Sequence, residues 1–205
     1  MNAHNSPAPL ARIGRQPSTS RAELSHVALE LFLERGFDET TVDDIAAAAG
    51  IGRRTLFRYF TSKNDLPWGD FDASLEGMRR FLDGSTVELP LVDTLTSAVV
   101  EFNRFPVEEI PYHRERMRLL LNVPALVAHS TLRYAAWRQV VAEYVSTRLD
   151  VAPGSLAPQT IAWVCLGASL SAYEQWLKHD DADLTDLLES AFSTLKAVFD
   201  SAASI

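Results

Sequence analysis

The 205-residue sequence contains a single cysteine, Cys165, and has no apolar run long enough to span a bilayer. One cysteine excludes a disulfide within one chain and a zinc site built from cysteines. The N-terminus lacks the basic-then-apolar layout of a signal peptide. These absences predict a cytoplasmic protein that does not associate with a membrane.

Catalytic motifs are also missing. The five histidines show no HExxH or similar metal spacing: His4, His26, His113, His129 and His179. The sequence has no G-x-S-x-G elbow, no Gly-rich phosphate loop and no dinucleotide-binding fingerprint. Cys165 lies in an apolar helical stretch, which favours a buried, inert thiol. We therefore expect no enzyme, no cofactor and no metal.

Helical periodicity runs through most of the chain, which is 47% hydrophobic and 22% charged. No segment shows the strict alternation of a strand between turn residues. This predicts an all-α fold with three parts: a flexible N-terminal arm (1–19), a helix-turn-helix domain of three helices (20–63) and a helical ligand-binding and dimerisation domain (64–205). The later helices are expected at 91–105, 111–127, 131–149, 158–178 and 183–201, after a long helix that Ser62 begins.

Charge is distributed unevenly between these parts. Residues 1–63 hold 8 Lys/Arg and 7 Asp/Glu, net +1, whereas residues 64–205 hold 11 and 20, net −9. An asymmetry of this kind points to a polyanionic partner at the N-terminal end. When the asymmetry is taken alone, ordinary solvated surface arginines are the commoner explanation.

The N-terminal third has the start and stop signals of three short helices. Ser20 and Glu23 form a capping box, and Gly36 is the expected end of the first helix. Thr41 begins the second helix, and Gly50-Ile51-Gly52 separates it from a third at 53–60. Two helices joined by a short Gly-containing turn are typical of a helix-turn-helix motif.

The third helix combines basic and hydroxyl side chains on one surface. If Leu56 and Phe60 face inward, the outward residues are Arg53, Arg54, Thr55, Arg58 and Tyr59. Guanidinium groups suit guanine edges and phosphates, and a helix of this kind fits the major groove of DNA. A solvated charged helix is the alternative interpretation.

Residues 40–66, TTVDDIAAAAGIGRRTLFRYFTSKNDL, resemble the signature of TetR-family repressors, and FRYFTSKNDLPWGDFD resembles the branch associated with mycofactocin gene clusters. The resemblance implies a double-stranded DNA operator, with Thr41 and Lys63 on phosphates and Tyr59 in a phosphate-contacting position. It also places Arg53, Thr55 and Arg58 against the groove.

Three residues depart from the family pattern, namely Gly52, Arg54 and Phe57, and they leave open which arginine contacts a base. Arg12 and Arg15 in the arm are candidates for further phosphate or minor-groove contacts.

The same resemblance implies that residues 64–205 bind an effector and form a dimer. Trp68, Phe102 and Trp137 are, as a group, candidates to line a ligand pocket between helices, although aromatic residues at helical spacing are commonly ordinary core. Arg114 and Arg118 share a helix face that Arg116 does not, and could hold a ligand's phosphate or carboxylate or pair with nearby glutamates. The mycofactocin-like branch suggests a long-chain acyl-CoA as the effector.

Two apolar stripes suggest a homodimer built from the last two helices. One is wide and lies at 184–199; the other consists of small residues and comprises Ile161, Cys165, Ala168 and Ala172. Two such helices from each subunit form a four-helix interface, whose twofold axis requires a near-palindromic operator. A monomer with both stripes in its core, and a helical interaction protein without DNA contacts, are the alternatives.

Overall fold

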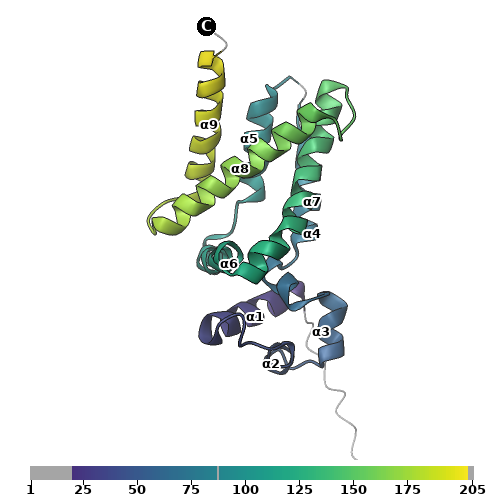
Figure 1. Cartoon of the computed structure of the whole chain (residues 1–205), viewed down its shortest axis with the longest axis vertical. Helices are drawn as coiled ribbons and strands as arrows, with labels where there is room; N and C mark the ends of the chain where they lie inside the picture. Colours follow the sequence, from purple (N-terminus) through teal and green to yellow (C-terminus); the bar gives the residue numbers. More distant parts are fainter. Residues whose placement is uncertain (1–19, 87, 203–205) are drawn as a thin grey trace, which may run out of the picture.

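The computed structural model describes residues 20–86 and 88–202, and side chains as far as 198. Within these ranges the chain is helical and has no strand (Figure 1). The helices are α1 (Arg21–Arg35), α2 (Val42–Ala48), α3 (Arg53–Tyr59), η1 (Lys63–Trp68), α4 (Phe71–Asp83), α5 (Leu91–Phe102), η2 (Val107–Glu109), α6 (Ile110–Asn122), α7 (Pro124–Leu149), α8 (Leu156–Lys178) and α9 (Leu184–Ala202). The all-α prediction is confirmed, whereas residues 1–19, including Arg12 and Arg15, lie outside the described part.

Local signals determine the N-terminal three-helix unit. The Ser20–Glu23 capping box begins α1, and Gly36 ends it with a φ of 89°. A second capping box, Thr41 with Asp44, begins α2. Gly50 has a φ of 67°, which a residue with a side chain rarely adopts, and it turns the chain from α2 into α3. These boundaries agree with the sequence prediction.

The long helix predicted to follow Ser62 is wrong, because the structure divides it in two. Residues 63–68 form the short 3₁₀ helix η1, which contains Pro67, and the chain turns at Gly69 before α4 begins. Gly69 has a φ of 58°, outside the helical region. Proline supplies no backbone N–H, and a positive φ interrupts the helical ladder, so one continuous helix cannot form here.

A second boundary also differs from the prediction. The helix expected at 111–127 ends at Asn122, and α7 begins at Pro124 and continues without a break to Leu149. Val123 has an extended backbone with a ψ of 117°, which suits a residue that precedes proline. Proline is favoured at the first position of a helix because its missing N–H would be unpaired there.

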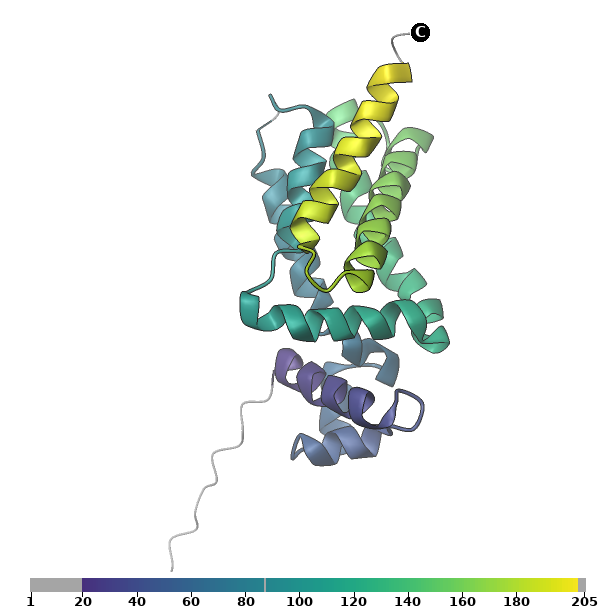
Figure 2. The ribbon, with the colours of Figure 1, turned by 90° about the vertical axis from the view of Figure 1, so that its left-hand side faces the viewer.

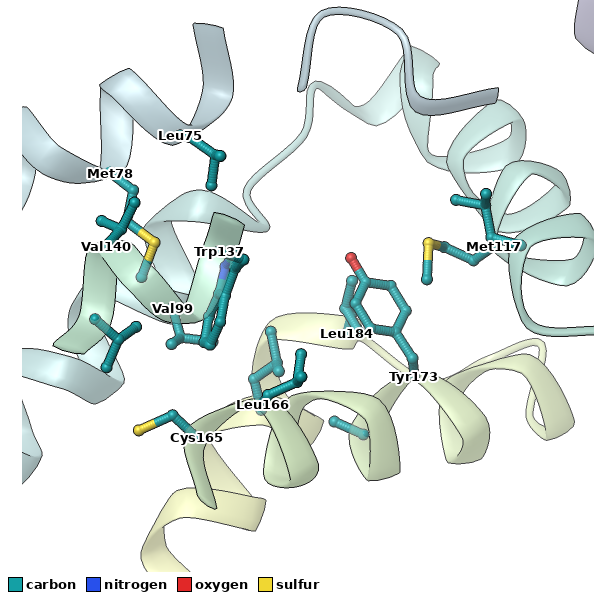
Figure 3. Packing of buried hydrophobic residues seen from close by; sticks show 14 of the residues in the cluster. Leu75, Met78, Val99, Met117, Trp137, Val140, Cys165, Leu166, Tyr173 and Leu184 are labelled. Atoms are coloured by element: carbon teal, nitrogen blue, oxygen red, sulfur yellow. The ribbon is translucent and has the colours of Figure 1, made fainter. Parts of the chain in front are cut away.

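The C-terminal helices form a bundle whose lower side is closed by α6. In Figure 2, α6 lies across the end of this bundle, directly above α1 of the N-terminal unit. Figure 3 shows part of the core, with Leu75 and Met78 of α4, Trp137 and Val140 of α7, and Leu166 of α8 packed together. Helix α6 thus lies between the two halves of the molecule.

Both stripes expected to form a dimer are largely used inside the chain. Helix α9 packs on α8 and α5 and buries Leu184, Leu188 and Phe192. On α8, Cys165 and Ala172 of the predicted small-residue stripe are buried. The exposed surface of α8 carries a different set, Trp163, Val164 and Gly167. The small-residue stripe of α8 was predicted to meet a partner subunit, and this prediction needs correction. Helices α7 and α9 of the same chain already cover that stripe.

Candidate nucleic-acid interface and ligand cavity

The outer surface of α3 presents the predicted basic residues. Leu56 and Phe60 are buried, with 1% and 3% exposure, and this orientation directs Arg53, Arg54 and Arg58 to solvent. Thr55 and Tyr59 are partly exposed on the same helix. Arg54 and Arg58 form no ion pair with any residue that the structure describes, so both guanidinium groups are available.

Three other predicted contacts are engaged within the domain. Nη1 of Arg53 donates to Oδ2 of Asp43 at 3.1 Å. The hydroxyl of Thr41 accepts from the backbone of Asp44 in its capping box. Nζ of Lys63 donates to the carbonyl oxygens of Phe37 at 2.8 Å and Thr40 at 3.1 Å. In the free chain Lys63 therefore holds the loop before α2, and its contact with phosphate remains a prediction.

A cavity of about 280 Å³ lies where the N-terminal unit meets the bundle. Its walls come from α1, the η1–α4 turn and helices α5 to α8. It is lined by Ala22, Ser25, His26, Trp68, Gly69, Asp70, Phe71, Ser74, Phe102, Asn103, Phe105, Glu109, His113, Arg116, Met117, Leu120, Tyr134, Trp137, Leu166, Ser169, Leu170 and Tyr173. Because α1 forms part of the wall, a molecule bound there would touch the DNA-binding unit directly.

The predicted aromatic group lies together on this cavity. Trp68, Phe102 and Trp137 all line it, and Phe71 connects them. The ring of Phe71 lies edge-on to Trp68 at 5.0 Å and to Phe102 at 6.1 Å, and Phe102 meets Trp137 at 6.4 Å. These contacts make a continuous aromatic wall suited to an apolar ligand.

The two arginines predicted as ligand-binding candidates do not line this cavity, and Arg118 makes the glutamate pair that the sequence left open as the alternative. Arg114 donates to the carbonyl oxygen of Trp176 at the end of α8, and its guanidinium lies 4.1 Å from the Trp176 ring. Arg118 pairs with Glu115 and, at 3.4 Å, with Asp180. Carbonyl groups at a helix C-terminus carry partial negative charge, so they attract the guanidinium of Arg114.

Arg116, the arginine on the other face of α6, lines the cavity instead. Its Nε is buried and has no hydrogen-bond partner. Burial lowers the pKa of its guanidinium, and the nearby charge of Glu109 opposes that shift. The two-residue spacing of the arginines does show that Arg116 occupies a separate face. It cannot show which face of α6 turns toward the cavity.

A buried polar chain supports the cavity wall. The hydroxyl of Tyr173 donates to Oδ1 of Asn103 at 2.5 Å, so Nε2 of His113, at 2.8 Å, must donate to Tyr173. Burial lowers the pKa of His113 to about 3, which leaves the ring neutral and Nδ1 as a free acceptor. Figure 3 shows Tyr173 reaching from α8 toward Met117 on α6. Sequence periodicity alone did not identify this chain.

Hydrogen bonds join the N-terminal unit to the bundle at two places, His26 and Asp65. Nε2 of His26 on α1 donates to Oε2 of Glu109 in η2 at 3.1 Å. Asp65 in η1 accepts at Oδ1 from His129 and Arg133 of α7, both at 2.8 Å. Hydrogen bonds from Thr61, Arg133, His129 and Ser62 lower the pKa of Asp65 against the opposing effect of its burial. The bundle is therefore joined to α1 and η1 through specific side-chain contacts.

Within residues 20–86 and 88–202, no His, Cys, Asp or Glu cluster is arranged to hold a metal. In the same part of the chain, no helix is long and apolar enough to cross a membrane. The thiol of Cys165 is buried, as expected, and burial raises its pKa to about 12.

Comparison with known proteins matches both halves of the chain. Residues 24–66 match the family described as bacterial regulatory proteins, tetR family, and residues 89–200 match the MftR C-terminal domain. A relative from Mycobacterium tuberculosis, provisionally named the mycofactocin biosynthesis transcriptional regulator MftR, is 46% identical over 93% of this chain and 96% of its own. TcmR of Streptomyces glaucescens, named as an HTH-type transcriptional regulator, is 28% identical over 89% of this chain and 85% of its own.

Solved structures share the fold at lower identity. FadR of Bacillus subtilis, crystallised with stearoyl-CoA, matches with a TM-score of 0.59 and 16% identity, over 84% of this chain and 95% of that one. FadR of Thermus thermophilus, crystallised with lauroyl-CoA, matches with a TM-score of 0.54 and 22% identity, over 85% and 92%. These structural matches support the fold alone.

Proposed function

The chain belongs to the TetR family of bacterial transcriptional regulators, and from this premise we propose that it is a repressor that an effector releases from DNA. It is a regulator and not an enzyme. In the proposed mechanism a homodimer binds a near-palindromic operator in the cytoplasm, with one α3 in each of two successive major grooves. The exposed guanidinium groups of Arg54 and Arg58 carry this proposal.

The effector proposed for the cavity is a small apolar molecule, with long-chain acyl-CoA as the candidate. The aromatic wall of Trp68, Phe102 and Trp137 supports an apolar ligand. FadR proteins of the same fold were crystallised with acyl-CoA molecules. A volume of about 280 Å³ lies at the low end for drug-sized ligands, so this cavity would receive only part of an acyl-CoA.

The proposed mechanism is a population shift. A ligand in contact with α1 would favour an arrangement whose two α3 helices no longer match successive major grooves. Such coupling is reciprocal, so operator DNA must weaken ligand binding by the same factor as ligand weakens DNA binding. Equal ligand affinity for free and DNA-bound protein would contradict this mechanism.

The test is fluorescence anisotropy with a labelled fragment from upstream of the protein's own gene, over a salt series. Arg58→Ala should weaken specific binding by about 1–3 kcal/mol if Arg58 contacts a base. If it contacts a phosphate instead, the loss should be uniform across sequences and the salt slope should fall by about one. Arg118→Ala, on α6 and away from α3, is the matched control.

Binding that ignores both sequence and Arg58 would leave three explanations: a distant operator, a ligand required as co-repressor, or a wrong functional assignment. A selection from random DNA would then distinguish a distant operator from a protein that binds no specific site. A helical interaction protein without DNA contacts would also show almost no salt dependence, whereas six to ten phosphate contacts cost roughly a thousandfold in affinity between 50 and 200 mM salt.

A further inference from the structure

Unpaired polar atoms are concentrated around the cavity between α1 and the bundle. Six buried side-chain atoms of the described residues lack a hydrogen-bond partner, and five belong to residues that line this cavity. These five are Ser25 Oγ, Trp68 Nε1, His113 Nδ1, Arg116 Nε and Tyr134 OH. An unpaired buried polar group destabilises the folded protein, so a ligand that pairs with several of them would recover free energy.

The chemistry of these atoms restricts the ligand. Trp68 Nε1 and Arg116 Nε can only donate, and the hydroxyls of Ser25 and Tyr134 can donate as well. Of the five, His113 Nδ1 is the atom that can only accept. The complementary ligand group is therefore rich in acceptors. A carboxylate offers two oxygens with about four acceptor positions.

Charge points to the same group. Arg116 forms no ion pair with any described residue, and the nearby Glu109 hydrogen-bonds to His26 at 3.1 Å. An anionic partner strongly stabilises a guanidinium that lies in an apolar, partly enclosed site. Glu109 already places one negative charge in the wall, which disfavours a doubly charged phosphate relative to a single carboxylate.

We propose that this cavity binds the carboxylate of an amphipathic monocarboxylic acid through Arg116 and Trp68, with the acid's apolar body against the aromatic wall. The inference rests on the proposed function, an effector-released regulator, and names a free acid as the effector in place of the acyl-CoA candidate. Ser25 of α1 borders the same site, so the carboxylate would lie beside the DNA-binding unit itself. The ligand's charged end, and not its tail, would then be the part that acts on α1.

The test is isothermal titration calorimetry with three probes that share a twelve-carbon chain: dodecanoate, dodecanol and lauroyl-CoA. We expect the wild-type protein to bind dodecanoate at least tenfold more tightly than dodecanol. Arg116→Met should weaken dodecanoate binding at least tenfold and leave dodecanol binding nearly unchanged. Arg118→Met, on the same helix but outside the cavity, should bind all three probes as the wild type does.

Trp68→Phe provides a second variant that keeps the ring and removes the N–H. It should weaken dodecanoate binding several-fold even if Arg116→Met does not fold, which circular dichroism would show. Equal binding of dodecanoate and dodecanol to the wild type, or dodecanoate binding that neither variant weakens, would overturn the proposal. Binding of lauroyl-CoA alone would overturn it too, yet would support the acyl-CoA effector.

Operator binding without ligand separates this proposal from the function on which it rests. All the cavity variants should bind operator DNA with wild-type affinity, because none of the substituted residues lies on α3. Normal operator binding combined with no carboxylate binding would reject the ligand class and keep the regulator.

Discussion

At the scale of single residues, two buried polar side chains in the wall of the cavity, His113 and Tyr173, stay neutral in the folded protein. His113 donates to Tyr173, stacks on Phe105 with ring centroids 3.9 Å apart, and is held neutral by burial and by the positive charge of Arg116. Burial also raises the pKa of the Tyr173 hydroxyl. A protonated His113 would place a second positive charge beside Arg116. The wall of the cavity is therefore sensitive to acid.

His113 should make the folded state less stable as the pH falls. Its pKa is about 3 in the folded protein against an ordinary 6.5, so below pH 6.5 the unfolded chain takes up a proton that the folded chain does not. His113 therefore does not lower the free energy of unfolding above pH 6.5. Between pH 6.5 and 3 it lowers this free energy by up to about 1.4 kcal/mol per pH unit. His113→Gln should flatten urea-unfolding stability against pH across this window.

The exposed His179 supplies the control for this measurement. His179→Gln makes the same substitution at an exposed position, so it reports the effect of replacing a histidine with glutamine outside the cavity wall. A profile that stays as steep in His113→Gln as in the wild type would show that other groups cause the acid sensitivity.

At the scale of secondary-structure elements, η1 is the connection between the DNA-binding unit and the bundle. It packs on α1, α6 and α7, and its Asp65 is held by His129 and Arg133 of α7. The side chain of Asp65 is only 6% exposed, so its charge depends on these partners. Removal of one member of a buried ion pair leaves the other charge uncompensated.

Asp65→Asn should therefore destabilise the protein by about 3 kcal/mol at pH 7, measured by urea unfolding. Because folding lowers the pKa of Asp65, the carboxylate stabilises the fold above its ordinary value of 3.8 and loses that effect as the pH falls below it. The difference between variant and wild type should shrink accordingly at low pH.

Asp72→Asn is a matched control, since Asp72 pairs with the same Arg133 at 3.3 Å but its side chain is 71% exposed. An exposed pair contributes about 1 kcal/mol or less, so this variant should stay close to the wild type. If both variants lost the same free energy of unfolding, the buried ion pairs of Asp65 would contribute no more than the exposed pair of Asp72, which would contradict this prediction.

At the scale of the whole molecule, the exposed surface of α8 is the candidate dimer interface. Trp163 is 56% exposed, and Val164 and Gly167 lie on the same surface, an arrangement that leaves apolar area uncovered in the single chain. A Cβ atom added at Gly167 would meet nothing within 4 Å in the chain. A substitution at Gly167 can therefore disturb dimer formation without disturbing the fold of the single chain.

Gly167→Glu should leave the helix content and fold of each chain intact and convert a dimer to a monomer in sedimentation velocity. The physical reason is that the substitution places a charge where two helices would approach closely. Operator affinity should fall with it, because a monomer presents only one α3. Ala157→Glu, at an exposed position near the start of the same helix, is the control for an added charge.

The sequence by itself determined the N-terminal unit, because its structure follows from local chemistry. The capping boxes at Ser20 and Thr41, the positive φ of Gly50 and the inward spacing of Leu56 and Phe60 involve neighbours in the chain, so the orientation of the arginines on α3 was predictable. The family resemblance added the DNA and effector roles, which no periodicity contains.

Only the tertiary structure decided which helix faces meet. Periodicity places Arg116 on a different face of α6 from Arg114 and Arg118, but it cannot predict which face turns toward the cavity. Packing between α1 and the bundle determines that orientation. For the same reason the sequence could not tell that α7 and α9 cover the small-residue stripe of α8 and leave Trp163 outside. Helix periodicity defines faces within one element, whereas burial depends on neighbours that are distant in the chain.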